Sequence, residues 1–168
     1  MLAVTTEGSY DMTFDLARIA ALIAVLGIAV IYGTDVFCAI VLRPALASVD
    51  DDALVAVTGS VHRYGDRRLP VPGVLGFFAA AVSAVLAAVT AHWTQAIAAG
   101  AAVLLLAIWL VLYTQVSAPI NRQLTAAADA GKALPNGRAL QAKWDRIIGA
   151  RAMLQGLALA ALCVALTI

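Results

Sequence analysis

Charged side chains are scarce in this sequence, and their scarcity excludes most classes of soluble protein. Of the 168 residues, 12% are charged and 63% are hydrophobic, and the mean hydropathy is +0.93. A soluble domain usually carries about 25% charged residues, so this chain has too few polar groups to cover a water-soluble globule. The same composition excludes intrinsic disorder. With 11 lysines and arginines against 10 aspartates and glutamates, the formal charge of +1 also argues against binding to nucleic acid.

Cysteines are few, and the common catalytic motifs are missing. The two cysteines, Cys38 and Cys163, lie in apolar stretches and form no CxxC motif, so they indicate neither a disulfide framework nor a catalytic Cys/His pair. The sequence contains no HExxH, no GxSxG, no P-loop and no dinucleotide-binding fingerprint. A membrane protein without a cofactor motif is therefore the first interpretation.

Long apolar runs are what the sequence does contain. A helix needs about 20 residues to cross a bilayer, and four runs are long enough, at 16–42, 73–91, 95–116 and 147–168. Because the bilayer core holds no water to satisfy the backbone, all four must be helices. We therefore predict an all-α fold, in which residues 1–168 form a single four-helix bundle embedded in the lipid bilayer.

The connections between the runs predict a topology. A tight turn joins the second and third spans, whereas segments 43–72 and 117–146 are each about 30 residues long, so both long loops lie on one side and both termini on the other. Ten of the eleven basic residues belong to the long-loop side: Arg43, Arg63, Arg67, Arg68, Arg122, Lys132, Arg138, Lys143, Arg146 and Arg151. Because cytoplasmic loops carry an excess of lysine and arginine, we predict a multi-pass protein of the cell's inner (plasma) membrane, with cytoplasmic long loops and both termini outside.

A layout of span, proline and long loop occurs twice. Pro44 and Pro119 are each expected to stop a helix as it leaves the membrane. In the first loop, the acidic run 50–52 is expected to cap a short helix over 53–64 that lies at the cytoplasmic interface. The second loop is expected to hold a short helix over 123–130, followed by a helix that starts near residue 138 and continues into the fourth span.

Two ionisable residues inside the predicted spans need a partner. Asp35 lies in the cytoplasmic third of the first span, and Arg151 lies about one turn inside the fourth span from the same side. A charge at this depth is costly and marks a functional candidate by default. We expect the two side chains to approach one another, or to share a polar partner such as Asn121. Such a pair pins two helices together, flanks a polar cavity, or does both.

His62 and Asp66 are four residues apart and share one face if their helix continues through Gly65. This spacing suits a metal pair, or a base with an orienting carboxylate. The alternative is two solvated side chains in a basic loop, with Gly65 ending the helix before Asp66. Similarly, Trp144 and Arg151 are seven apart and share a helical face, as site residues or as an aromatic interface anchor beside a snorkelling arginine.

Motifs spread over nearly the whole chain match a known pattern. They are Gly33, Phe37 and Pro44 around the end of the first span, the stretch 62–73, the segment Pro119-Ile120-Asn121-Arg122-Gln123-Leu124, and Trp144 with Arg151 seven residues later. In this layout the chain resembles the anthrone oxygenase-like family of small four-helix membrane proteins, many of unknown function. The family pattern commonly has a histidine four residues after the tryptophan, where this chain has Ile148.

The resemblance implies a cofactor-independent oxygenase that converts an anthrone, a tricyclic aromatic ketone, to an anthraquinone with dioxygen. A His or Asp near the bundle mouth would remove a proton, and an arginine and an asparagine amide would stabilise the oxyanion. The catalytic candidates are His62, Asp35, Arg151 and Asn121, and the candidates to contact an apolar substrate are Trp144, Tyr64 and Phe37.

Two other classes of function stay open at this point. One is a non-enzymatic four-helix protein that binds a lipid or a small apolar ligand, or that assists a membrane complex. The other is a protein that holds a metal ion or haem through His62 and Asp66. Small residues on the fourth span, Gly149, Ala152 and Gly156, permit close helix contact within the chain or with a second copy, so a homo-oligomer is also compatible with the sequence.

Overall fold

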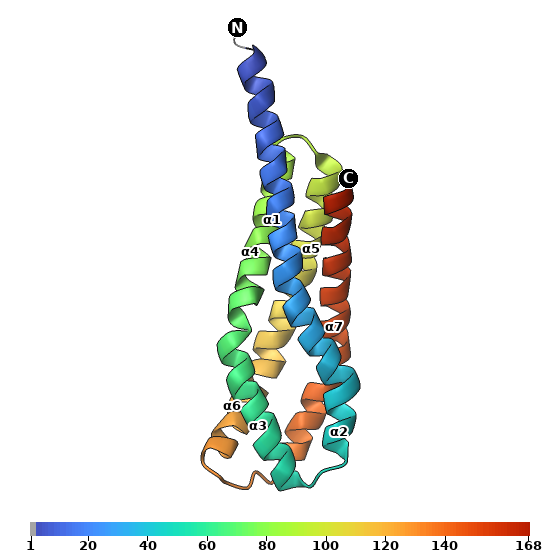
Figure 1. Ribbon diagram of the computed structural model, residues 1–168. Helices are drawn as coiled ribbons and strands as arrows, with labels where there is room; N and C mark the ends of the chain where they lie inside the picture. Colours follow the sequence, from blue (N-terminus) through green and yellow to red (C-terminus); the bar gives the residue numbers. More distant parts are fainter. Residues whose placement is uncertain (1–2) are drawn as a thin grey trace.

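The computed structural model describes the backbone of residues 3–168 and the side chains from Met12 onwards, and this part of the chain is all-α (Figure 1). Four helical stretches are long and apolar enough to cross a membrane: Met12–Ala47, Pro70–Val89, Trp93–Asp129 and Gly137–Thr167. They run alongside one another as a bundle, which confirms the prediction of four long apolar helices.

The helices follow one another with few breaks. In chain order they are α1 (Ala3–Phe37), the π-helix η1 (Cys38–Leu42), α2 (Arg43–Ala47), α3 (Asp51–Arg68), α4 (Pro70–Val89), α5 (Trp93–Leu112), the π-helix η2 (Tyr113–Ser117), α6 (Ala118–Asp129) and α7 (Gly137–Thr167). The start of α1, the α4–α5 turn and the end of α7 lie at one end of the bundle (Figure 1). The α2–α3 and α6–α7 connections lie at the other end, which we call the long-loop end.

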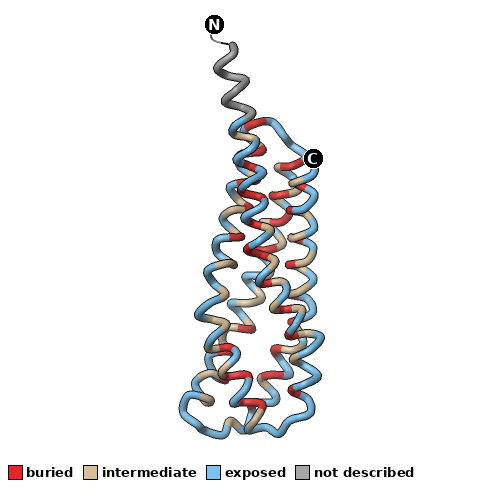
Figure 2. The backbone as a smooth tube through the Cα atoms, in the orientation of Figure 1, coloured by how far each residue is buried: buried red, intermediate tan, exposed pale blue. Residues whose placement is uncertain are grey.

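Small side chains let the helices approach closely. Buried positions face inward between the helices, while the outer faces are exposed (Figure 2). The central core cluster consists of Ala24, Ile28, Ala80, Ala102, Leu106, Ala158 and Leu162. Between α1 and α4 the backbones themselves meet, because a Cβ placed on Gly27 would lie 2.6 Å from the carbonyl oxygen of Pro72. Small residues at such contacts are typical of helices that pack inside a bilayer.

Pro44 and Pro119 do not stop their helices, and that prediction was wrong. Each lies in the first turn of a helix, α2 or α6, that directly continues a π-helical segment, η1 or η2. Proline has no N–H to donate, and its ring clashes with the carbonyl group four residues before it. We attribute the continuation to the π-helical turn, because its i→i+5 bonding pattern widens the backbone just where the ring must fit.

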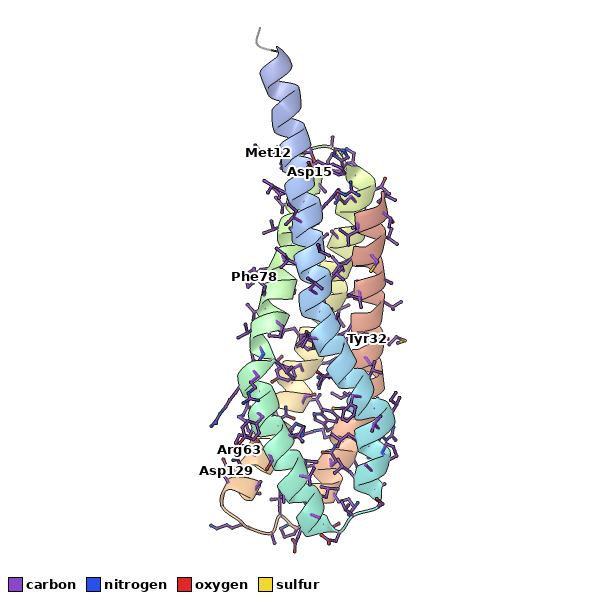
Figure 3. All side chains as sticks on the ribbon, viewed as in Figure 1. Met12, Asp15, Tyr32, Arg63, Phe78 and Asp129 are labelled. Atoms are coloured by element: carbon purple, nitrogen blue, oxygen red, sulfur yellow. The ribbon has the colours of Figure 1, made fainter. Side chains whose placement is uncertain are left out.

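The predicted long loops, 43–72 and 117–146, are therefore mostly helical. Asp50 caps α3 as expected, since its Oδ1 accepts a hydrogen bond of 2.7 Å from the N–H of Ala53. However, α3 does not end at Gly65 and continues to Arg68. It packs against α6, and Arg63 on α3 forms an ion pair with Asp129 on α6 (Figure 3).

Candidate functional site

The two charges predicted to need a partner form a buried ion pair. One guanidinium nitrogen of Arg151 donates to Asp35 Oδ1 at 2.8 Å, and the other donates to Ser117 Oγ at 2.6 Å. Gln155, one turn after Arg151 on α7, donates to Asp35 Oδ2 at 3.0 Å. The expectation that Asp35 and Arg151 approach one another is confirmed, and each oxygen of Asp35 has a partner.

Aromatic rings surround the arginine of this pair. The guanidinium carbon lies 5.4 Å from the ring centre of Trp144, 5.5 Å from that of Tyr113 and 6.0 Å from that of Trp109. Contact with aromatic faces stabilises a cation by about 0.5–2 kcal/mol. Three rings and a carboxylate thus hold the charge of Arg151 at a fixed position inside the bundle.

A second carboxylate, that of Asp66, lies at the end of α3 and is held by neutral groups. Its Oδ1 accepts hydrogen bonds of 2.9 Å from the Tyr113 hydroxyl and 3.0 Å from the Asn121 amide. The same amide reaches Oδ2 at 3.3 Å. Among the side chains that the structure describes, no arginine, lysine or histidine forms an ion pair with Asp66. Asn121 therefore forms hydrogen bonds with Asp66 and is not the shared polar partner of Asp35 and Arg151.

A cavity of about 270 Å³ joins these two carboxylates. Its polar wall consists of Asp35, Asp66, Tyr113 and Arg151, and the rest of its lining is mainly apolar and aromatic, with Phe77, Phe78 and Trp109. Four lining residues, Pro70, Val74, Phe78 and Leu110, are also exposed on the outside of the bundle. The cavity therefore opens sideways between α4 and α5, and Phe78 lies at this outer side of α4 (Figure 3).

His62 is buried, but it does not line this cavity. Its ring centre lies 5.4 Å from that of Trp144, and its Nε2 has no hydrogen-bond partner. Burial lowers the pKa of His62 to about 4, an effect that nearby Asp66 opposes and Arg151 reinforces. The imidazole is therefore neutral near pH 7, and it is not a solvated loop side chain.

The donors near His62 do not make up a metal site. Metal sites in proteins usually need three or four ligands, and nowhere among the described residues do three His, Cys, Asp or Glu side chains gather closely enough to bind one ion. Asp66 already accepts hydrogen bonds from Tyr113 and Asn121, and His62 packs against Trp144, outside the lining of the cavity.

The remaining predicted site residues lie outside the cavity lining. Trp144 is buried against Arg151, whereas Tyr64 and Phe37 are 52% and 53% exposed. Tyr64 packs instead under the guanidinium of Arg68. The cavity thus brings together Asp35, Arg151 and Asp66 from the predicted set, with Asn121 and Trp144 directly behind its wall.

Sequence reasoning missed Tyr113 and Trp109, which supply much of the cavity wall. The two aromatic residues are four apart and stack at 5.8 Å between ring centres, so their helical spacing was an available signal. Gln155 was missed in the same way, although it follows Arg151 by four residues. In comparisons with known proteins, the chain matches no family model, no curated protein and no solved structure.

Proposed function

We propose that this chain is a multi-pass protein of the plasma membrane, with its long-loop end in the cytoplasm. The four apolar helices support the membrane assignment. The orientation rests on the basic residues, ten of which belong to the long-loop side, and on the tendency of such residues to stay in the cytoplasm. In this arrangement the exposed faces of α3 and α6 lie near the lipid headgroups.

Within that framework, the protein binds a small, flat aromatic molecule that enters from the lipid. The observation that carries this proposal is the cavity, which has an apolar mouth between α4 and α5 and a polar inner wall. An apolar cavity of about 150 Å³ is enough to hold one benzene ring, so about 270 Å³ suits a ligand with two or three fused rings. The few polar groups at one side would orient it.

Ligand binding can be tested with 9-methylanthracene and the purified protein in lipid nanodiscs. Trp109 lines the cavity, so excitation of tryptophan should produce sensitised emission from the bound probe, above the signal from empty nanodiscs. Val74→Phe narrows the mouth and should weaken binding about tenfold, since overpacking costs about 1–3 kcal/mol. Val85→Phe is the matched control, because Val85 is an exposed residue of α4 outside the cavity. Equal signals from all three proteins would refute the proposal.

A second candidate function is the oxygenase chemistry that the family resemblance implies. The carboxylate of Asp66 in the cavity wall favours it, because a base at that position can accept a proton from an acidic aromatic methylene. The resulting carbanion would take up dioxygen, and loss of water would leave the quinone. The base is then Asp66, since His62 does not line the cavity.

Purified protein mixed with anthrone under air distinguishes this chemistry from binding alone. Catalysis predicts one dioxygen consumed per anthraquinone formed, at a rate above that of protein-free buffer. Asp66→Asn should abolish the excess rate while anthrone still binds. A rate equal to that of buffer would limit the function to binding.

A further inference from the structure

The charged groups that line the cavity leave one negative charge without a counter-charge. The lining contains two aspartates and one arginine. The arginine, Arg151, is bound to Asp35 at 2.8 Å, and both side chains of that pair are almost fully buried. Asp66 is the remaining charge, and its partners, Tyr113 and Asn121, are neutral.

The hydrogen bonds of Asp66 also leave room for a ligand. A carboxylate oxygen can accept two hydrogen bonds. Oδ1 accepts two, from Tyr113 and Asn121, whereas Oδ2 accepts only one of 3.3 Å from Asn121. The acceptor capacity that remains on Asp66 is therefore concentrated on Oδ2, in a residue that lines the cavity.

Aromatic side chains complete the lining on the lipid side. Phe77 and Phe78 pack edge to face at 5.8 Å between ring centres, and both line the cavity. Their π-faces are not occupied by Arg151, which contacts Trp109 and Tyr113 instead. Carboxylates and aromatic faces are the two groups that proteins use to bind organic cations.

The depth of the cavity fits a molecule with a charged end and an apolar body. Asp66 lies near the end of α3, while Phe77 and Phe78 lie about two turns into α4, towards the middle of the bundle. A ligand that is charged near the headgroups and apolar further in would match this gradient. Amphipathic molecules adopt the same orientation at a membrane surface.

We propose that the ligand class is a lipophilic aromatic cation, a fused-ring compound with one permanently or readily protonated nitrogen, whose positive charge meets Asp66. This inference rests on the proposed binding function and names the chemistry of its ligand. Arg151 does not oppose it, because the charge of Arg151 is balanced by Asp35.

Two probes of the same shape isolate the charge. 10-Methylacridinium and 9-methylanthracene differ in one ring atom, which is a positively charged nitrogen in the first and a neutral carbon in the second. Binding of each is measured by sensitised emission in nanodiscs of phosphatidylcholine, whose zero net charge limits non-specific adsorption of the cation. We expect the cation to bind about tenfold more tightly than the hydrocarbon, after correction for partition into empty nanodiscs.

The variant Asp66→Asn should remove this preference, so that the cation and the hydrocarbon bind with similar affinity. Asp66→Glu, which keeps the charge, should retain it. Asp52→Asn is the control, because it removes the same charge from an exposed position of the same helix, outside the cavity. If Asp66→Asn fails to fold, the ratio of the two affinities in the unmodified protein still tests the proposal.

The outcomes separate the ligand class from the binding function. If 9-methylanthracene binds as tightly as the cation, the inference is overturned and the binding function stands. If Asp66→Asn retains the full preference for the cation, a group other than Asp66 binds the positive charge, and the inference is overturned as well. If neither probe binds above the empty nanodisc, the binding function itself fails.

Discussion

Breaking the ion pair between Asp35 and Arg151 should destabilise the protein strongly. The variant Asp35→Asn keeps the shape of the side chain but removes its charge, so Arg151 stays buried without a counter-charge. The two side chains are only 5% and 6% exposed, and the loss of one partner from such a pair costs about 3–5 kcal/mol. Because the asparagine oxygen can still accept a hydrogen bond, we expect about 3 kcal/mol less free energy of unfolding.

The double variant Asp35→Asn/Arg151→Gln tests whether the two residues act as a pair. With both charges removed, no uncompensated charge remains, so the double variant should lose less than the sum of the two single variants, by about 1–3 kcal/mol. Unfolding is followed by far-UV circular dichroism in mixed micelles with an increasing fraction of denaturing detergent.

Arg43→Gln serves as the control for this cycle. The Nε of Arg43 lies 4.0 Å from Oδ2 of Asp145, and the side chain of Arg43 is 58% exposed. Exposed ion pairs contribute about 0–1 kcal/mol, so this variant should change the free energy of unfolding very little. The reasoning is refuted if each single variant loses no more free energy of unfolding than Arg43→Gln. It is also refuted if the loss of the double variant equals the sum of the two single losses within about 0.5 kcal/mol.

Three further predictions concern other parts of the chain. Burial lowers the pKa of His62 from 6.5 to about 4, so the contribution of the neutral imidazole to stability is fully present above pH 6.5 and is lost as the pH drops towards 4. His62→Gln should remove this pH dependence, up to about 3 kcal/mol, in the same unfolding assay. Gly59→Ala should lower the free energy of unfolding by about 1–3 kcal/mol, because the new Cβ would lie 2.5 Å from the carbonyl oxygen of Leu124 on α6. Gly100→Ala is the control, since a Cβ there meets nothing within 4 Å and should not destabilise the protein. On a cysteine-free background, a cysteine at Arg138 should be labelled from the cytoplasm and one at Thr5 from outside, and the reverse pattern would refute the proposed orientation.

Much of the architecture could be predicted because the bilayer allows few alternatives. An apolar run of sufficient length must be a helix, so four runs in the sequence predict four spanning helices. The pairing of Asp35 with Arg151 was predictable for a related reason. A buried charge requires a partner, and these two lie at similar depth on different spans, so depth counted along each helix was enough to bring them together.

The lateral position of the other site residues could not be predicted in this way. Asp66 lies on α3, and its partners Tyr113 and Asn121 lie on η2 and α6, about 50 positions away in the sequence. Their contact depends on how α3 and α6 pack, which depth alone does not determine. The burial of His62 could not be predicted for the same reason, because His62 packs against Trp144 on α7, far from it in the sequence.

The π-helical turns before the two prolines also affect the geometry of the site, although in the sequence the prolines indicated only helix ends. Tyr113, Ser117 and Asn121 follow one another at intervals of four residues, and all three contact the site, through Asp66 or Arg151. In a regular α-helix of 3.6 residues per turn, positions four apart drift steadily around the axis. A π-helical turn contains more residues, so the turn at η2 keeps these three side chains closer to one face. The widening that lets the helix continue through Pro119 therefore also aligns the polar side chains that bind Asp66 and Arg151.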